Sequence, residues 1–195
     1  MQEATYQFDK QLYENADIVV ACNTNFNREL LKKAKMAGKI IATDVHVLSD
    51  VHDEYNRDFM QYADLLFLSD ENINTDYREF LMDIENNYQN EIIVLGMGAK
   101  GALMYVKDEQ KFYELEAVSN LKVVNTVGAG DALFSSFIHF YAKGLKPIDC
   151  LKRAEVFAAY KIGYDGASVG FTDEQTVEKI VNQFTKSKSL RLKDR

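Results

Sequence analysis

Short, almost wholly apolar runs separated by segments with helical spacing constrain the fold of this chain more than any other feature. The runs occupy residues 18–21, 40–42, 65–68 and 92–95. None alternates with polar residues, as is typical of parallel strands that are covered on both faces. Between them, apolar residues recur at i, i+3, i+4 and i+7 in 30–37 and in 77–88, which predicts helices. The alternation predicts right-handed βαβ units and an α/β sheet with helices on its faces.

The pattern changes after Leu95. Two runs, 102–106 and 111–115, flank a polar segment of four residues and predict a hairpin. A short strand is predicted at 122–124. Three helices are predicted to follow, from 129 to 143, from Pro147, and from Thr172, which has capping-box spacing to Gln175.

Size and charge exclude several classes of protein. A chain of 195 residues with 47% hydrophobic and 27% charged residues is typical of a soluble globular domain. The formal net charge of −7 argues against nucleic-acid binding, which needs a basic surface. We expect one domain over 1–185, followed by a solvated, disordered tail over 186–195 with five basic residues and one acidic residue.

Cysteine usage and apolar run length bear on location. Cys22 and Cys150 form neither a disulfide framework nor a CxxC site, and no run approaches the length of a membrane span. The first ten residues lack a basic segment followed by an apolar one. We therefore expect a cytoplasmic protein that binds no membrane.

The segment 123–138 carries the most chemistry. The small residues Gly128, Ala129 and Gly130 lie between an apolar segment and an apolar helix, where backbone can approach a ligand closely. The first N–H groups of a helix have no intrahelical partner, so they can bind an anion. Asp131 lies in the first turn, where the helix dipole favours a carboxylate. Amides that bind phosphate beside a base suit phosphoryl transfer to an alcohol, although a purely structural turn remains the alternative.

Residues 125–135, N-T-V-G-A-G-D-A-L-F-S, closely resemble the C-terminal signature D-T-x-G-A-G-D of ribokinase-like, PfkB-type carbohydrate kinases. The resemblance implies a three-layer α/β/α sandwich with a mostly parallel sheet. It also implies ATP as phosphoryl donor, Asp131 as catalytic base, and amides of Gly128, Ala129 and Gly130 around the γ-phosphate. Three further residues are implied to lie near the nucleotide, namely Asn125, Thr126 and Gly166.

A second glycine-rich stretch, 96–101, contains G-x-G-x-x-G after a predicted strand. NAD binding would require a helix at the third glycine, whereas a hairpin strand is predicted there, so the NAD-binding alternative ranks last. The resemblance instead aligns the stretch with a kinase turn, T-L-G-x-x-G, in which Gly98 and Gly101 match and Gly96 replaces threonine. Nucleotide contact and a purely structural turn are both open for these glycines.

Metal sites are implied by the same resemblance. Where the family carries N-x-x-E, this chain has Ser69 and Asn72, so Asp70 or Glu71 is the candidate for a hydrated Mg²⁺. A K⁺ site would use Asn125, Val127 and the loop 163–168. The histidines have no metal-ligand spacing, and His139 is predicted to pack within an apolar helix.

The resemblance spans about residues 12 to 185 and lacks the family's N-terminal third, with its lid and most sugar contacts. Two functions follow: an ATP-dependent kinase that phosphorylates a sugar hydroxyl, and a nucleotide-binding homologue without kinase activity. A homodimer or a partner that covers the missing lid face is the expected assembly. Phe157 and Tyr160 are candidates for contacts with adenine.

Overall fold

The structure is a computed structural model that describes residues 8–118 and 121–186. It divides into two compact units, the first of residues 1–94 and 105–111, and the second of 95–104 and 112–195. The boundary crosses the last three strands. The predicted tail falls outside the described residues from 187 onward.

Six strands form one sheet in the order β1-β2-β3-β4-β5-β6. They are β1 (Ile18–Val20), β2 (Ile40–Val47), β3 (Leu65–Ser69), β4 (Ile92–Gly96), β5 (Ala102–Val106) and β6 (Lys111–Leu115). The pairs β1–β2 and β2–β3 are parallel, with a register shift between Asp44 and Val47. The six predicted strand regions up to residue 115 are all confirmed, and 107–110 is the hairpin loop.

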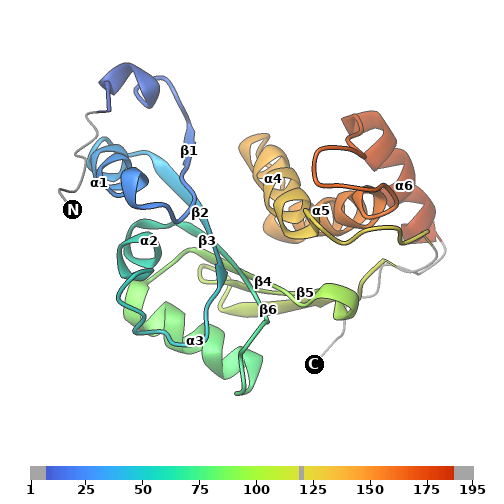
Figure 1. The fold of residues 1–195 in the computed structure, drawn as a ribbon, viewed down its shortest axis with the longest axis horizontal. Helices are drawn as coiled ribbons and strands as arrows, with labels where there is room; N and C mark the ends of the chain where they lie inside the picture. The colour runs from blue at the N-terminus through green and yellow to red at the C-terminus, as the bar shows by residue number, and fades with distance from the viewer. Residues whose placement is uncertain (1–7, 119–120, 187–195) are drawn as a thin grey trace. The chain divides into compact units, whose positions relative to one another are not determined.

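The first unit contains α1 (Arg28–Met36), α2 (Arg57–Tyr62) and α3 (Tyr77–Tyr88). The three helices lie on the same side of β1, β2 and β3 (Figure 1). Short 3-10 turns, η1 (Lys10–Leu12) and η2 (Asn25–Asn27), flank β1 in the sequence. The helix α3 begins at a strong cap, because the Asp76 carboxylate accepts hydrogen bonds from the amides of Arg78 and Glu79.

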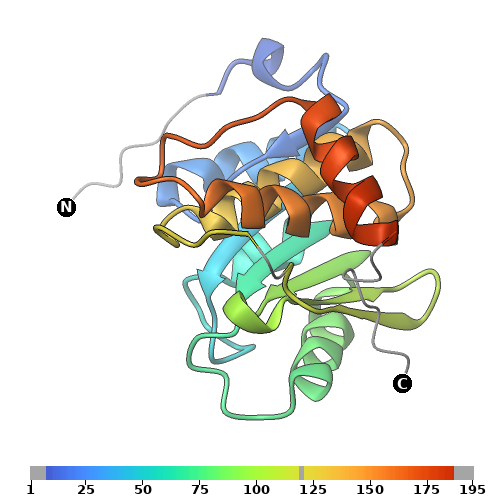
Figure 2. The same cartoon turned by 90° about the vertical axis from the view of Figure 1, so that its right-hand side faces the viewer.

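The second unit contains η3 (Gly98–Lys100), α4 (Ala129–Ala142), α5 (Pro147–Lys161) and α6 (Glu174–Lys186). Helices α4 and α5 pack side by side, and α6 contacts α5 (Figure 2). Within α4, Phe137 is fully buried, and Leu151 and Ala154 are fully buried within α5. Packing of these apolar stripes therefore stabilises the helical layer of this unit.

Two local predictions in this unit are wrong. Residues 122–124 form no strand, because the amides of Val124 and Asn125 both donate to the Ile162 carbonyl, at 2.7 and 3.1 Å, in an isolated loop contact. The last helix begins at Glu174 instead of Thr172. Asp173 is its cap, since its Oδ1 accepts from the Thr176 amide at 2.7 Å.

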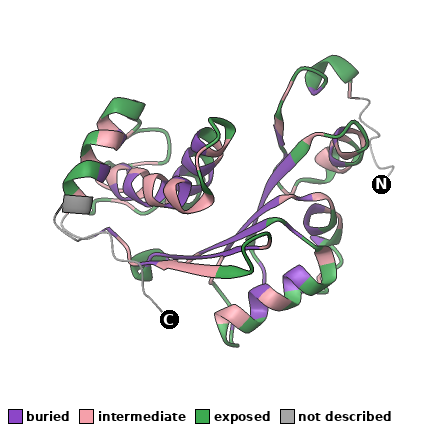
Figure 3. Cartoon of the chain, turned by 180° about the vertical axis from the view of Figure 1, so that it is seen from behind, coloured by how far each residue is buried: buried purple, intermediate pink, exposed green. Residues whose placement is uncertain are grey.

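Burial follows the predicted strands except at the end of the sheet. The apolar cores of β2, β3 and β4 are buried (Figure 3). β1 is an edge strand, so Val20 remains 47% exposed and the expected coverage of both faces fails there. Within the described part of the chain, no helix has the length and apolarity that crossing a membrane requires.

Burial affects two ionisable groups in α5. It raises the pKa of the Cys150 thiol to about 12, which keeps this cysteine a neutral packing group. It also raises the pKa of the Glu155 carboxyl from 4.5 to about 8. Between pH 4.5 and about pH 8, Glu155 of the folded chain holds a proton that the unfolded chain has lost. The free energy of unfolding therefore falls as the pH rises through this window.

Replacing Glu155 with glutamine is expected to remove this pH dependence. The variant should match the wild type near pH 5 and be more stable at pH 8 by about 3 kcal/mol, because no charge is then buried. Urea unfolding at both pH values measures the difference. The control is Glu79→Gln, at an exposed position in the first turn of α3, which should change both values by the same small amount. A wild-type stability that is level between pH 5 and pH 8 would refute the assignment.

Candidate functional site

The predicted anion-binding turn is present at the start of α4. Gly128 is the residue before the helix and has a left-handed backbone, with φ of 82°. The Asn125 side chain holds the approach to the turn: its Oδ1 accepts from the Val127 amide at 2.9 Å, and its Nδ2 donates to Asp165 Oδ1 at 2.8 Å. The turn is thus fixed by its own hydrogen bonds before any ligand binds.

The amides of the turn are not equivalent. The Ala129 amide donates to the Thr126 carbonyl at 3.1 Å, whereas the Ala132 amide makes the first helical bond, to the Gly128 carbonyl at 3.0 Å. Gly130 and Asp131 lie between these two, and within the described residues their amides, like that of Gly128, have no backbone acceptor. The amides of Gly128, Gly130 and Asp131, and not that of Ala129, are therefore best placed to bind an anion.

Asp131 lies in the first turn of α4 and is exposed. The positive end of the helix dipole stabilises its carboxylate. A carboxylate at the solvent-accessible edge of an anion-binding turn can accept a proton from a hydroxyl group that approaches the same anion. The candidate site is therefore the combination, within a single helical turn, of amides that can bind an anion and a carboxylate that can accept a proton.

Lys161 is a site residue that the sequence analysis missed. Its side chain is 1% exposed, and its Nζ donates a hydrogen bond to the Val127 carbonyl. A β-carbon added to Gly128 would lie 3.3 Å from Cε and 3.4 Å from Nζ of Lys161. The one available signal was its helical spacing from the buried Ala154, because a lysine seven residues along an apolar stripe is unusual.

The two glycines of the second stretch differ in surroundings. Gly101 is buried with φ of 101°, and a β-carbon there would lie 2.0 Å from the Leu115 carbonyl oxygen. Gly98 is exposed with φ of 55° and open space around it. Close backbone packing thus accounts for Gly101 without a ligand, while Gly98 remains a candidate for nucleotide contact. Gly101 directly precedes the strand β5 and no helix begins there, which contradicts the NAD-binding alternative.

The remaining candidate residues are placed as follows. Thr126 is exposed, and Gly166 has φ of 102° in the loop after α5. Asp70 follows β3 in the first unit, and its Oδ2 accepts from the Tyr77 hydroxyl at 2.8 Å. Glu71 is exposed beside it. Their role toward Mg²⁺ stays a prediction, and within residues 8–118 and 121–186 no cluster of three or more His, Cys, Asp or Glu side chains is arranged to hold a metal.

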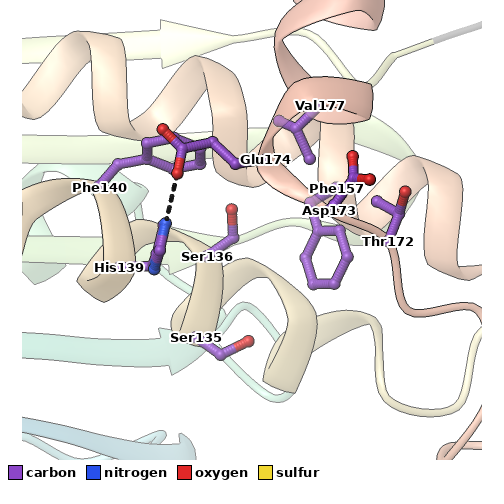
Figure 4. A pocket seen from close by; sticks show the side chains of 9 residues that line it. All are labelled: Ser135, Ser136, His139, Phe140, Phe157, Thr172, Asp173, Glu174 and Val177. Carbon is purple, nitrogen blue, oxygen red and sulfur yellow. Dashed lines mark hydrogen bonds and ion pairs between the residues drawn. The ribbon is translucent and has the colours of Figure 1, made fainter.

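A cavity of about 230 Å³ lies among α4, α5 and the start of α6 (Figure 4). His139 is not a packing residue as predicted, because its side chain is 51% exposed and its Nε2 lies 3.3 Å from Glu174 Oε2. Lys143 pairs with the same carboxylate, and hydrogen bonds from Lys143 and His139 lower the pKa of Glu174. Phe157, a candidate for adenine contact, lines this cavity, which contains neither Gly128 nor Asp131.

Gly128 and Gly130 allow a paired test of the turn. Gly130→Ala is expected to leave stability unchanged or slightly higher, because a β-carbon there meets nothing within 4 Å and alanine favours helix. The same methyl group would obstruct a phosphate at the amides, so ATP affinity should fall about tenfold. Gly128→Ala should instead destabilise the fold by about 1–3 kcal/mol through its positive φ. Thermal unfolding and titration with ATP separate the two effects, and full ATP affinity in Gly130→Ala would place the phosphate elsewhere.

Comparison with known sequences gives a consistent result. Residues 1–174 match the pfkB family carbohydrate kinase. The ribokinase of Dictyostelium discoideum is 24% identical over 144 residues, which cover 73% of this chain and 43% of the relative. The 1-phosphofructokinase of Haloferax volcanii is 36% identical over 80 residues, or 40% of this chain and 25% of the relative. The chain therefore spans less than half the length of these relatives.

Solved structures show the same fold. The microbiome-derived acarbose kinase Mak1 superposes with a TM-score of 0.82 at 23% identity, over 89% of this chain and 58% of that one. Arabidopsis thaliana ribokinase, solved with ribose and ATP, gives 0.72 at 18% identity, over 88% and 57%. The predicted ribokinase-like α/β fold is thus confirmed. Because the family match covers most of its length, the chain belongs to the pfkB family of carbohydrate kinases.

Proposed function

We propose that this chain is the nucleotide-binding and catalytic part of an ATP-dependent phosphotransferase that acts on a sugar hydroxyl. The observation that carries the proposal is the turn 128–131, where, within the described residues, three unengaged amides and an exposed carboxylate lie at one helix N-terminus. The family membership of the chain supports the same reaction.

In the proposed reaction, the γ-phosphate of ATP lies against the amides of Gly130 and Asp131. The Asp131 carboxylate accepts the proton of the attacking sugar hydroxyl. The sugar oxygen forms a bond to the γ-phosphorus, the bond from that phosphorus to the β,γ-bridging oxygen breaks, and ADP leaves. The amides stabilise charge on the transferred group, since they are already oriented toward it.

Mg²⁺ is proposed to accompany ATP, with Asp70 or Glu71 contacting its water shell. The carboxylates fit this role, because hydrated Mg²⁺ needs only one or two of them. When bound, Mg²⁺ would neutralise phosphate charge. We also propose a cytoplasmic location and a sugar or sugar derivative as the small-molecule partner. The chain matches only part of its relatives. We propose that a second copy or a partner chain supplies the sugar-binding groups that lie in the unmatched part.

The proposal is tested by ATP titration followed by an ADP-release assay. The acceptor panel should include ribose, deoxyribose, fructose 1- and 6-phosphates and nucleosides, which represent the activities named for the relatives. ATP binding with ADP release that depends on one acceptor is the expected result. Absence of ATP binding at millimolar concentrations would overturn the proposal.

A second candidate is nucleotide binding without transfer. The chain covers only 43% of the ribokinase relative, so acceptor-binding groups can lie in the unmatched part. Binding of ATP with no ADP release on any acceptor would support this candidate over the first.

A further inference from the structure

A monovalent cation does not fit the place where the family resemblance implies one. Such a cation would be held by backbone carbonyl oxygens near Asn125, Val127 and the loop after α5. In the structure the Val127 carbonyl accepts a hydrogen bond from Lys161 Nζ. The adjacent Ile162 carbonyl is engaged by the amides of Val124 and Asn125. The Val127 carbonyl, one of the implied ligands, is therefore already occupied by a donor of the chain itself, and so is the Ile162 carbonyl just before the loop.

We propose that the Lys161 ammonium replaces that cation as a positive charge that belongs to the chain itself, behind the anion-binding turn. This inference rests on the proposed function, because the role of the charge is to support a bound phosphate. Lys161 is a positioning residue in this scheme: it acts through the Val127 carbonyl and the turn, without contact with the transferred group.

Burial is the first argument. Lys161 is 1% exposed, and a buried ammonium is costly unless hydrogen bonds or an opposite charge compensate it. Within the described residues no carboxylate forms an ion pair with Lys161. The ammonium has three N–H groups, and the hydrogen bond to Val127 uses one of them. A buried cation without a carboxylate partner beside this turn favours an anion on the turn.

Helix geometry is the second argument. Lys161 is the last residue of α5, where the negative end of the helix dipole stabilises a cation. Gly128 precedes α4, whose positive end faces an anion. The Lys161 carbonyl also accepts from the Tyr164 amide at 3.1 Å, which fixes the start of the following loop. The lysine thus connects the two halves of the site, the turn before α4 and the loop after α5.

The proposal predicts that nucleotide binding by this chain does not depend on K⁺. Removing the lysine side chain should open space beside the Val127 carbonyl and create that dependence. The test compares wild type, Lys161→Ser, Lys161→Met and the control Lys179→Ser, at an exposed lysine of α6. Each is measured in KCl and in choline chloride at equal ionic strength, by thermal unfolding without nucleotide and by ATP titration.

The expected results differ for each variant. Wild type and Lys179→Ser should behave identically in the two salts. Lys161→Ser should bind ATP at least about tenfold more weakly in choline chloride, the cost of one charge-assisted interaction, and KCl should restore affinity and raise its unfolding temperature. Lys161→Met fills the space without a charge, so its affinity should be low in both salts.

Several outcomes would overturn the proposal. One is a wild type that binds ATP more tightly, or unfolds at higher temperature, in KCl. Another is Lys161→Ser that keeps wild-type affinity in choline chloride. If neither the wild type nor any variant binds ATP, the proposed function fails, but the unfolding temperatures still test the role of Lys161. A higher unfolding temperature in KCl for Lys161→Ser alone supports the inference. An equal unfolding temperature of Lys161→Ser in the two salts refutes it. If Lys161→Ser folds only in KCl, that supports it; failure to fold in both salts counts against it.

Discussion

Replacing Asp131 with asparagine is expected to lower the rate of ATP-dependent phosphorylation by about 10³-fold and to leave ATP affinity close to that of the wild type. Asparagine has nearly the same shape and keeps the backbone amide of residue 131, so the anion-binding turn should survive. It cannot accept the hydroxyl proton. The loss should therefore appear in kcat, and rapid-quench single turnovers with saturating ATP measure it directly.

Asp149→Asn is the matched control. Asp149 also lies in the first turn of a helix, α5, and its carboxylate pairs with Lys152 at 3.1 Å. The control removes a comparable charge from a comparable position, so it should affect stability slightly and the rate not at all. A rate for Asp131→Asn within threefold of the wild type would exclude Asp131 as the base. Equal rate losses in both variants would indicate a general effect of helix charge.

The parts of the fold that were predicted correctly are those encoded by local pattern. The strands β2, β3 and β4 are continuous apolar runs, and α1 and α3 have a clear helical period. The turn at 128–130 was found because glycine, helix start and acid are adjacent in the chain. The sequence alone therefore places Asp131 and Gly128 together.

The parts that were missed depend on contacts between distant residues. The helix α2 has six residues, of which two apolar ones are buried, too few to show a period. Lys161 is 34 residues from Val127, and its place on an apolar stripe does not indicate that its ammonium binds the Val127 carbonyl. The β-branched residues of the loop 122–124 predict a strand, because such residues favour strands. Instead, the amides of Val124 and Asn125 both donate to one carbonyl, that of Ile162, so no strand ladder forms.

Gly101→Ala is expected to be the most destabilising of the glycine substitutions, by about 3 kcal/mol or more. The added β-carbon would lie 2.0 Å from the Leu115 carbonyl oxygen and 2.6 Å from the Ala117 nitrogen, and backbone atoms cannot move aside as a flexible side chain does. Gly98→Ala is the matched control in the same 3-10 turn. With open space around it and φ of 55°, only backbone strain of about 1 kcal/mol applies.

Urea unfolding of both variants gives the two free energies, and ATP titration of Gly98→Ala adds the functional side. If Gly98 approaches the nucleotide, the stable Gly98→Ala variant should bind ATP more weakly, because its new methyl group occupies the open space. A Gly101→Ala variant as stable as Gly98→Ala would show that the backbone at Leu115 can yield. Close packing against Leu115 of β6 would then no longer explain why residue 101 is glycine, and contact with a ligand would have to explain it.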